Sequence, residues 1–273
     1  MCFCFLIITH LIDISNKLNI FKMCIHINEM GGDLMDKKRE EIIKLLPKEI
    51  RKLFMMSEID FSRLQEIRLR VNMPLIVVYG AKEYFISCTG KPVSEIKEAY
   101  RVTCQQIKEA MVYISSYSRY AFEDEIRQGF ITVEGGHRVG VAGRIIWDGG
   151  KIKSITYISF INIRISHEVI GCSDSVIGYL YNDDSFYNTL IISPPRCGKT
   201  TLLRDIVRSI ANGNAGSRGR TVGIVDERSE ISACHLGCPQ NNIGCRTDVL
   251  DGCPKSEGMM MLVRSMSPEI VAV

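Results

Sequence analysis

The segment 193–201 holds residues whose types and spacing suit phosphate chemistry. It lies between a short apolar run, residues 189–192, and a helical pattern over residues 202–211. A loop that wraps phosphate needs small residues, so that backbone N–H groups point inward, and a helix N-terminus behind it whose dipole favours anions. We therefore predict a phosphate-binding loop formed by Ser193, Pro194, Pro195, Arg196, Cys197, Gly198, Lys199, Thr200 and Thr201.

Three of these residues have specific predicted roles. Gly198 lets the backbone approach the phosphates, Lys199 reaches the β- and γ-phosphates, and the Thr200 hydroxyl ligates Mg²⁺. The predicted ligands are therefore ATP and Mg²⁺. Ser193 and Arg196 stand where the common pattern has glycine, and Arg196 would be strained if its backbone needed a positive φ. The alternative is a decayed or purely structural loop.

The second half of the chain alternates strands and helices, which predicts an α/β sheet. Buried strands are expected at residues 189–192, 221–225 and 270–273, and the middle one ends on Asp226 and Glu227. Pro254 is expected at the first position of a helix that runs to residue 266. The apolar stripe on that helix is more typical of core packing than of a ligand site; its members are Met259, Leu262, Val263 and Met266.

The first half predicts an α+β domain over residues 35–170, followed by the α/β domain over residues 171–273. Helices are expected at residues 37–54 (interrupted by Pro47), 102–114 and 120–128. Strands are expected at residues 64–71, 75–79, 130–133, 138–147 and 152–165. Residues 1–30 lack a clean period, and the codons for Gly31, Gly32 and Asp33 can resemble a ribosome-binding site before Met35. We expect residues 1–34 to be an upstream extension that is not native.

Composition excludes several classes. The formal net charge of +3 and the lack of a Lys- or Arg-saturated segment argue against nucleic acid as a direct partner. Eleven cysteines at irregular spacing, without an export signal, indicate reduced thiols. A zinc site is the alternative, but paired C-x-x-C knuckles are absent. Its candidate ligands are Cys234, His235, Cys238, Cys245 and Cys253.

Several blocks of sequence resemble the stage III sporulation protein AA family of endospore-forming bacteria. In the second half these are residues 188–205, 225–231, 246–255 and 257–269. In the first half they are residues 66–70, Pro74 with Leu75, and residues 136–144. The resemblance covers almost everything after Met35, and Arg196 is the clearest departure from it.

The resemblance implies a sporulation ATPase similar to the secretion ATPases of type II and type IV systems. Such proteins carry an N-terminal α+β domain and a RecA-like P-loop ATPase domain and assemble as hexameric rings. By that resemblance the protein hydrolyses ATP to energise the channel between mother cell and forespore. Its expected partners are membrane proteins of that channel, which would make it cytoplasmic in the mother cell and peripheral to the membrane.

The resemblance also implies roles for matching residues. The block that contains Asp226 and Glu230 aligns with an acidic box, where a carboxylate orients the attacking water or binds Mg²⁺ through water. Both are predicted to be catalytic together with Lys199; the alternative is a salt-bridged or capping acid. Three first-domain arginines are candidates for contact with γ-phosphate or are structural: Arg138, Arg144 and Arg164. Asp248 and Asp251 are expected to be turn residues or caps.

In the family, the strand at residues 270–273 leads into a Walker B acid pair and then a histidine box, and this chain stops before them. We therefore expect a truncated RecA-like domain that binds nucleotide weakly and hydrolyses it poorly. Two other functions stay open. One is an inactive ring scaffold that binds nucleotide, and the other is a nucleic-acid motor of the RecA type.

Overall fold

The computed structural model describes residues 32–80, 82–115, 125, 129–182, 185–194, 197–213 and 217–273. These residues form two compact units, divided between His167 and Glu168, and each is described by itself. Both combine helices and strands, so the predicted mixed α/β class is confirmed. The expected extension at residues 1–34 lies almost wholly outside the described residues, as does the expected helix at residues 120–128.

The first unit is built on an antiparallel sheet with the order β4-β3-β2-β1-β7-β6-β5. The predicted strands of this unit are confirmed, whereas the sequence did not predict β3 and β4, which carry Lys, Glu and Pro. The bounds are β1 Leu64–Arg70, β2 Ile76–Tyr79, β3 Lys82–Ile86, β4 Pro92–Val93, β5 Phe130–Val133, β6 His137–Asp148 and β7 Lys151–Arg164.

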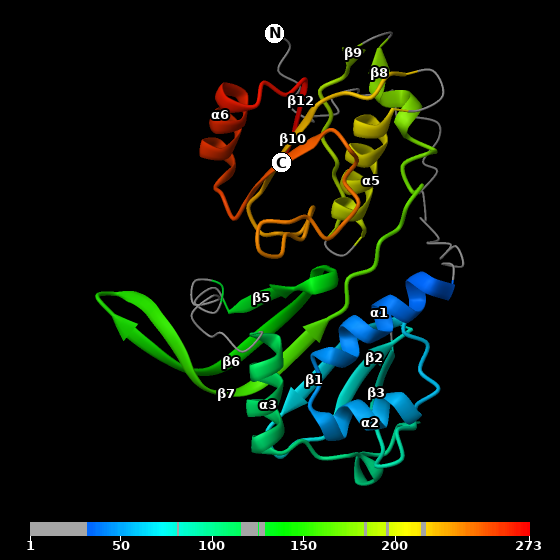
Figure 1. The fold of residues 1–273 in the computed structure, drawn as a ribbon, viewed down its shortest axis with the longest axis vertical. Helices are drawn as coiled ribbons and strands as arrows, with labels where there is room; N and C mark the ends of the chain where they lie inside the picture. Colours follow the sequence, from blue (N-terminus) through cyan, green and yellow to red (C-terminus); the bar gives the residue numbers. More distant parts are fainter. Residues whose placement is uncertain are drawn as a thin grey trace. The chain divides into compact units, whose positions relative to one another are not determined.

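Among the described residues, one face of this sheet is covered by the helices α1 Gly32–Lys44, α2 Lys48–Met56 and α3 Cys104–Ile114 (Figure 1). Pro47 separates α1 from α2 as predicted, because it cannot donate an intrahelical hydrogen bond. Thr103 caps α3 in a reciprocal pair of hydrogen bonds with Gln106. Short 3-10 turns occupy Ile96–Glu98 and Glu134–Gly136.

The outer halves of β6 and β7 leave the body of the sheet as a curved two-stranded arm (Figure 1). β5 pairs with β6 only as far as Gly140, and β1 pairs with β7 only from Phe160 onward. We call residues 142–158 the hairpin arm. In contrast to the arm, the inner halves are core: Val139, Val141, Ile161 and Ile163 are all buried.

The second unit contains a parallel sheet with the order β11-β10-β12. Helix α5 lies on one face and α6 on the other (Figure 1). All five residues of β10 are buried, as expected for the central strand of a sheet covered on both sides. The bounds are η4 Ile177–Leu180, β8 Tyr181–Asn182, β9 Ser185–Phe186, α5 Lys199–Asn212, β10 Val222–Asp226, β11 Thr247–Asp251, α6 Lys255–Ser265 and β12 Ile270–Ala272.

The strand predicted at residues 189–192 is wrong in this structure. The segment forms no ladder with the described strands; Thr189 is buried, but Ile192 is 81% exposed. An apolar run predicts burial, but a strand also needs a neighbouring backbone in register. Because this segment lacks such a neighbour among the described residues, it stays irregular.

Three smaller expectations also change. Asp248 and Asp251 lie on the strand β11 and not in a turn, because their backbone pairs in parallel with β10. Pro254 is the N-cap of α6, and the helix starts one residue later than predicted. Of the predicted core stripe, Leu262 is buried but Met266 is 52% exposed.

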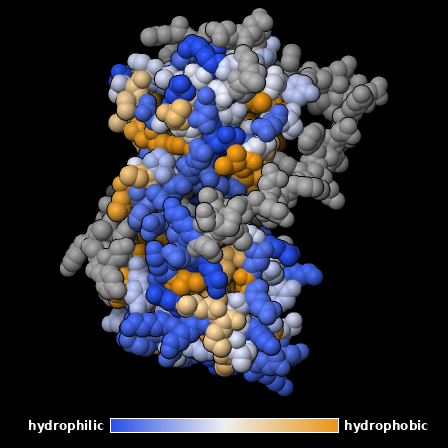
Figure 2. Space-filling view, turned by 45° about the vertical axis from the view of Figure 1, so that its right-hand side comes forward, coloured by the Kyte–Doolittle hydropathy of each residue, from blue (hydrophilic) through white to orange (hydrophobic). Residues whose placement is uncertain are grey.

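The surface seen in Figure 2 is largely hydrophilic, and hydrophobic residues gather in separate patches. Among the described residues, no helix combines the length and the apolar character that crossing a bilayer requires.

Two histidines are held neutral inside the first unit. His137 Nδ1 accepts a hydrogen bond from the Ser166 amide at 3.1 Å, and His167 Nε2 lies 2.7 Å from the Leu64 carbonyl oxygen. Burial and the nearby Lys38 ammonium lower the pKa of His137 to about 3 and that of His167 to about 4. Burial also raises the pKa of Glu41, which lies beside His137.

These shifts predict that acid weakens the first unit. The unfolded histidines take up protons below about pH 6.5, whereas the folded ones resist until about pH 4. The stability they contribute is therefore complete above pH 6.5 and falls toward pH 4. At pH 5 the free energy of unfolding is lower than at neutral pH by about 2 kcal/mol per histidine. Glu41, whose pKa is raised, offsets part of this loss at lower pH. Urea unfolding followed by circular dichroism at pH 7.5 and pH 5 measures this difference.

His167→Gln is the matched variant, because its amide can still donate to the Leu64 carbonyl. This variant should reduce the difference in the free energy of unfolding between pH 7.5 and pH 5 by the amount that one histidine contributes. An equal urea midpoint at pH 7.5 and pH 5 in the unchanged chain would contradict the burial argument.

Candidate functional site

The loop before α5 ends on a residue whose backbone needs glycine. Gly198 is the N-cap of α5 with φ 84° and ψ 13°, a left-handed conformation that costs other residues free energy. From this point α5 begins at Lys199, so its unpaired N–H groups face the loop. The positive potential at this helix end therefore lies where the predicted phosphates would bind.

Lys199 folds back over the loop. Its Nζ donates to the carbonyl oxygens of Ser193 at 2.9 Å and Pro194 at 3.0 Å. These two carbonyls hold the ammonium group in front of the helix end, where phosphate oxygens can replace them as acceptors. Pro195 and Arg196 lie outside the described residues, and Cys197 is exposed beside Gly198.

An acidic loop follows β10 and is organised by Asp226. This residue is 2% exposed, and its carboxylate accepts four hydrogen bonds. The donors are the amides of Glu230 at 2.8 Å, Ile231 at 2.9 Å and Ser232 at 2.8 Å, and the Ser232 hydroxyl at 2.7 Å. The Asp226 oxygens are thus committed to the loop, while the side chain of Glu230 stays exposed.

Arg204 fastens the same loop from the other side. Its guanidinium donates from α5 to the carbonyl oxygens of Glu230 at 2.7 Å and Ile231 at 2.6 Å. Within the loop, Ser229 adopts a positive φ of 50° and its hydroxyl donates to Asp251 at 2.6 Å. Asp226 therefore accepts hydrogen bonds from three N–H groups of the loop, and Arg204 donates hydrogen bonds to two of its carbonyl oxygens.

A cavity of about 610 Å³ lies between the phosphate-loop helix and the acidic loop. Its size is that of a small-molecule site. It opens at the carboxyl ends of β10 and β12, where ligands bind in open α/β sheets. The polar side chains that line it are Lys199, Thr200, Asp226, Glu227, Arg228, Glu230 and Lys255.

The structure thus brings four predicted residues to one cavity: Lys199, Thr200, Asp226 and Glu230. Thr201 is not among the residues that line the cavity, and its backbone carbonyl oxygen accepts from the Cys172 thiol at 3.7 Å. The arginines Arg138, Arg144 and Arg164 belong to the first unit, where Arg138 stacks 4.2 Å from the centroid of the Phe130 ring. Sequence reasoning missed Arg204 and Lys255, for which the chain offers no motif.

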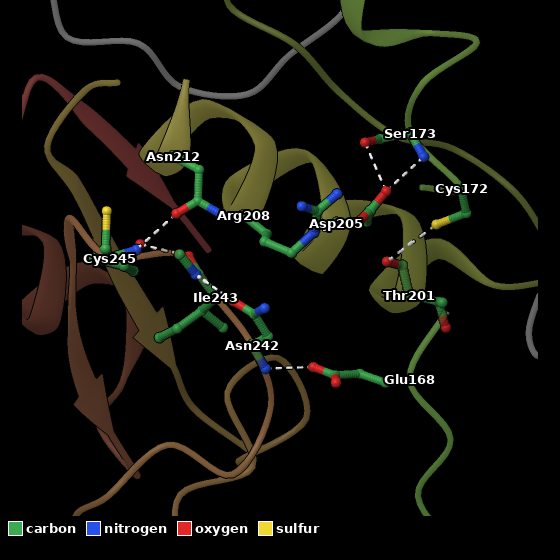
Figure 3. Close-up of polar contacts among 12 residues, drawn as sticks. Glu168, Cys172, Ser173, Thr201, Asp205, Arg208, Asn212, Asn242, Ile243 and Cys245 are labelled. Atoms are coloured by element: carbon green, nitrogen blue, oxygen red, sulfur yellow. Dashed lines mark hydrogen bonds and ion pairs between the residues drawn. The ribbon is translucent and has the colours of Figure 1, made fainter. Parts of the chain in front are cut away.

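A second set of contacts fastens residues 168–173 to α5 (Figure 3). Asp205 accepts from both the amide and the hydroxyl of Ser173, each at 2.7 Å, and from Arg208 Nε at 2.7 Å. Burial alone would raise the pKa of Asp205, but these hydrogen bonds outweigh it and lower the pKa. Glu168 also accepts from the Asn242 amide. The segment that enters the second unit is therefore anchored on the helix that carries Lys199.

The zinc alternative finds no support in the described ranges, where no three His, Cys, Asp or Glu side chains come together around a metal position. Cys234 is buried, and burial raises the pKa of its thiol to about 11, which disfavours the thiolate that zinc needs.

The comparisons with known proteins identify the family of this chain. The sequence model of the family described as "Sporulation stage III, protein AA" matches residues 36–273. The chain belongs to the stage III sporulation protein AA family. The stage III sporulation protein AA of Bacillus subtilis (strain 168) is 40% identical over 234 residues, which are 85% of this chain and 72% of that protein.

Solved structures similar to this family member include two ATPases named DotB. The one from Legionella pneumophila has a TM-score of 0.44 at 13% identity, over 77% of this chain and 55% of that one. The one from Yersinia pseudotuberculosis has a TM-score of 0.37 at 11% identity, over 75% of this chain and 53% of that one. The matched region therefore spans about half the length of these two proteins.

The contacts of Asp226 predict that it stabilises the fold of the second unit. Asp226→Ala would leave three amides, two of them buried, and a buried hydroxyl without their acceptor. We expect a loss of about 3 kcal/mol or more in the free energy of unfolding. Urea unfolding followed by circular dichroism measures it.

Glu227→Ala is the matched control, because Glu227 lines the same cavity but is exposed. It should change the free energy of unfolding by no more than about 0.5 kcal/mol. Equal effects of the two substitutions would contradict the structural role of Asp226.

Proposed function

We propose that this member of the stage III sporulation protein AA family binds ATP with Mg²⁺ in the cavity between α5 and the acidic loop. The observation that carries the proposal is that Lys199, Thr200 and Glu230 line one cavity at the N-terminus of α5. A helix N-terminus with a left-handed glycine cap and a lysine directly behind it suits the charge and shape of phosphates. The cavity volume of about 610 Å³ also suits a nucleotide.

Each residue has a distinct proposed role. The Lys199 ammonium neutralises phosphate charge, and the Thr200 hydroxyl is the protein ligand that would hold Mg²⁺. When bound, the metal ion would supply neutralisation of the charge on the phosphate oxygens. Glu230 orients the attacking water, because its exposed side chain lines the same cavity as Lys199 and Thr200.

Asp226 was predicted beside Glu230 as a catalytic acid, and we now propose a positioning role for it. Its oxygens already accept four hydrogen bonds from the loop. Such a carboxylate acts on catalysis by holding Glu230 at the cavity. Arg204 supports the same position through the Glu230 carbonyl.

The remaining parts of the proposal rest on family membership. We infer an α+β domain at residues 35–170 followed by a RecA-like ATPase domain at residues 171–273. In the whole protein, ATP hydrolysis would energise the channel between mother cell and forespore during endospore formation. The protein would form a homo-hexamer in the mother-cell cytoplasm, peripheral to the membrane and bound to the channel's membrane proteins, without direct contact to nucleic acid.

The first test is nucleotide binding by this chain. Lys199→Ala should weaken the binding of a fluorescent ATP analogue with Mg²⁺ by roughly 10- to 100-fold, because a charge-assisted contact to phosphate is lost. Thr200→Val should remove most of the affinity gained on adding Mg²⁺. Arg264→Ala is the control, since this exposed arginine on α6 removes one positive charge away from the cavity. Unchanged affinity in Lys199→Ala would overturn the proposal.

A sporulation assay of variants distinguishes an ATPase from a scaffold that only binds nucleotide. In the whole protein, Glu230→Gln should leave nucleotide affinity within about twofold while blocking sporulation, since charge on the attacking water's partner is lost. Normal sporulation with either Glu230→Gln or Lys199→Ala would favour the inactive scaffold. ATP turnover stimulated by single-stranded DNA would favour the nucleic-acid motor.

A further inference from the structure

The hairpin arm of the first unit has no neighbouring strand among the described residues. Beyond Ala142 and Phe160, β6 and β7 pair only with each other, from Arg144 opposite Thr156 to Asp148 opposite Lys151. The arm ends at Gly149 and Gly150, with φ of 57° and 79°, around which an added side-chain carbon would meet open space. An isolated two-stranded ribbon is marginally stable in water. Ile155 and Ile158 pack against the core of the unit, so it is the exposed apolar side chains nearer the tip that call for a partner surface.

Both faces of the arm carry apolar side chains, and one face carries more of them than the other. Cross-strand partners share a face, and the pairs Ile145 with Ile155 and Trp147 with Ile152 make one face apolar. Toward the tip this face is open: Trp147 is 66% exposed and Ile152 is 37% exposed. The opposite face pairs Arg144 with Thr156 and Ile146 with Ser154.

The charge of the arm is positive. The sequence of residues 142–158 holds three basic residues, Arg144, Lys151 and Lys153, and one acidic residue, Asp148. Lys153 Nζ lies 3.0 Å from the Asp148 carboxylate, but both side chains are more than 60% exposed, so water and salt weaken this pair. The tip therefore combines an exposed tryptophan and isoleucine with excess basic charge.

We propose that the tip of the hairpin arm inserts into the headgroup region of a membrane that contains anionic lipid. Tryptophan partitions to that region, where its ring meets both apolar chains and water. Basic side chains beside it are attracted to anionic headgroups. Weak apolar insertion and electrostatic attraction add, so the two together give reversible attachment.

A protein partner fits the tip less well. Each side of a stable protein interface buries about 800 Å², far more than the partly exposed Ile145, Trp147 and Ile152 offer. The glycine turn presents no side chain for shape recognition, but it lets the narrow tip enter between headgroups. The inference is independent of the nucleotide cavity, which lies in the other unit.

The chain carries its own reporter, because Trp147 is its single tryptophan. The full chain is mixed with phosphatidylcholine vesicles, with and without phosphatidylglycerol. We expect its emission to shift to the blue only with phosphatidylglycerol present and to be quenched by brominated acyl chains. Added salt should reverse both effects, since it screens the attraction between exposed charges.

Charge variants test the same contact while keeping the reporter. Lys151→Gln with Lys153→Gln should lower the vesicle partition coefficient by about tenfold or more. Lys91→Gln with Lys97→Gln is the matched control, because it removes the same charge from exposed positions at the other edge of the sheet. Lys199→Ala should bind vesicles like the unchanged chain, which separates this proposal from nucleotide binding.

Three outcomes would overturn the proposal. The first is unshifted Trp147 emission at saturating anionic vesicles. The second is an equal, salt-insensitive shift with neutral vesicles, which would remove the role of the basic side chains. The third is a shift that grows with protein concentration in the absence of lipid, which would show that a second copy of the chain covers the tip.

Discussion

The buried carboxylate of Asp226 lies at the end of β10. It accepts hydrogen bonds from three amides and one hydroxyl of the residues that follow it. A buried charge is tolerated only when hydrogen bonds replace the water it has lost, and here the loop itself supplies them. The shape of the loop therefore depends on its hydrogen bonds to this carboxylate. The position of Glu230 at the cavity follows from this contact.

The other features of the cavity are arranged around that loop. Arg204 reaches it from α5, so the helix behind the phosphate loop and the loop behind β10 are joined by side-chain contacts. Lys199 is the first residue of the same helix, and its ammonium group donates to the carbonyl oxygens of Ser193 and Pro194. The Lys199 ammonium group and the Glu230 carboxylate thus line one cavity. The helix and the loop that carry them are joined by the hydrogen bonds of Arg204.

Much of this was predictable from local patterns, and the failures share a cause. Pro47 marked a helix break, and the alternation around Ile67 and Leu69 marked a strand, because each depends on neighbouring residues alone. Strand β11 was missed because its aspartates are uncommon in strands, and its formation depends on distant pairing with β10.

The candidate site shows the same division between local and distant information. A helix directly behind Gly198 was predictable, because the glycine and the helical pattern after it are contiguous in the sequence. The commitment of Asp226 to its own loop was not, because it depends on a turn in which Ser229 takes a positive φ. Ile192 was wrongly expected to be buried, because hydropathy does not say whether a neighbouring strand is present.

The anchoring of residues 168–173 on α5 has a mechanical consequence. Ser173 donates two hydrogen bonds to Asp205, and Glu168 accepts one from the Asn242 amide. The chain just past His167 is therefore held at two points. A pull on the backbone at His167 is therefore borne by the side of α5 and not absorbed by a loose linker. A force that acts on the backbone at His167 is therefore transmitted to α5, the helix that carries Lys199.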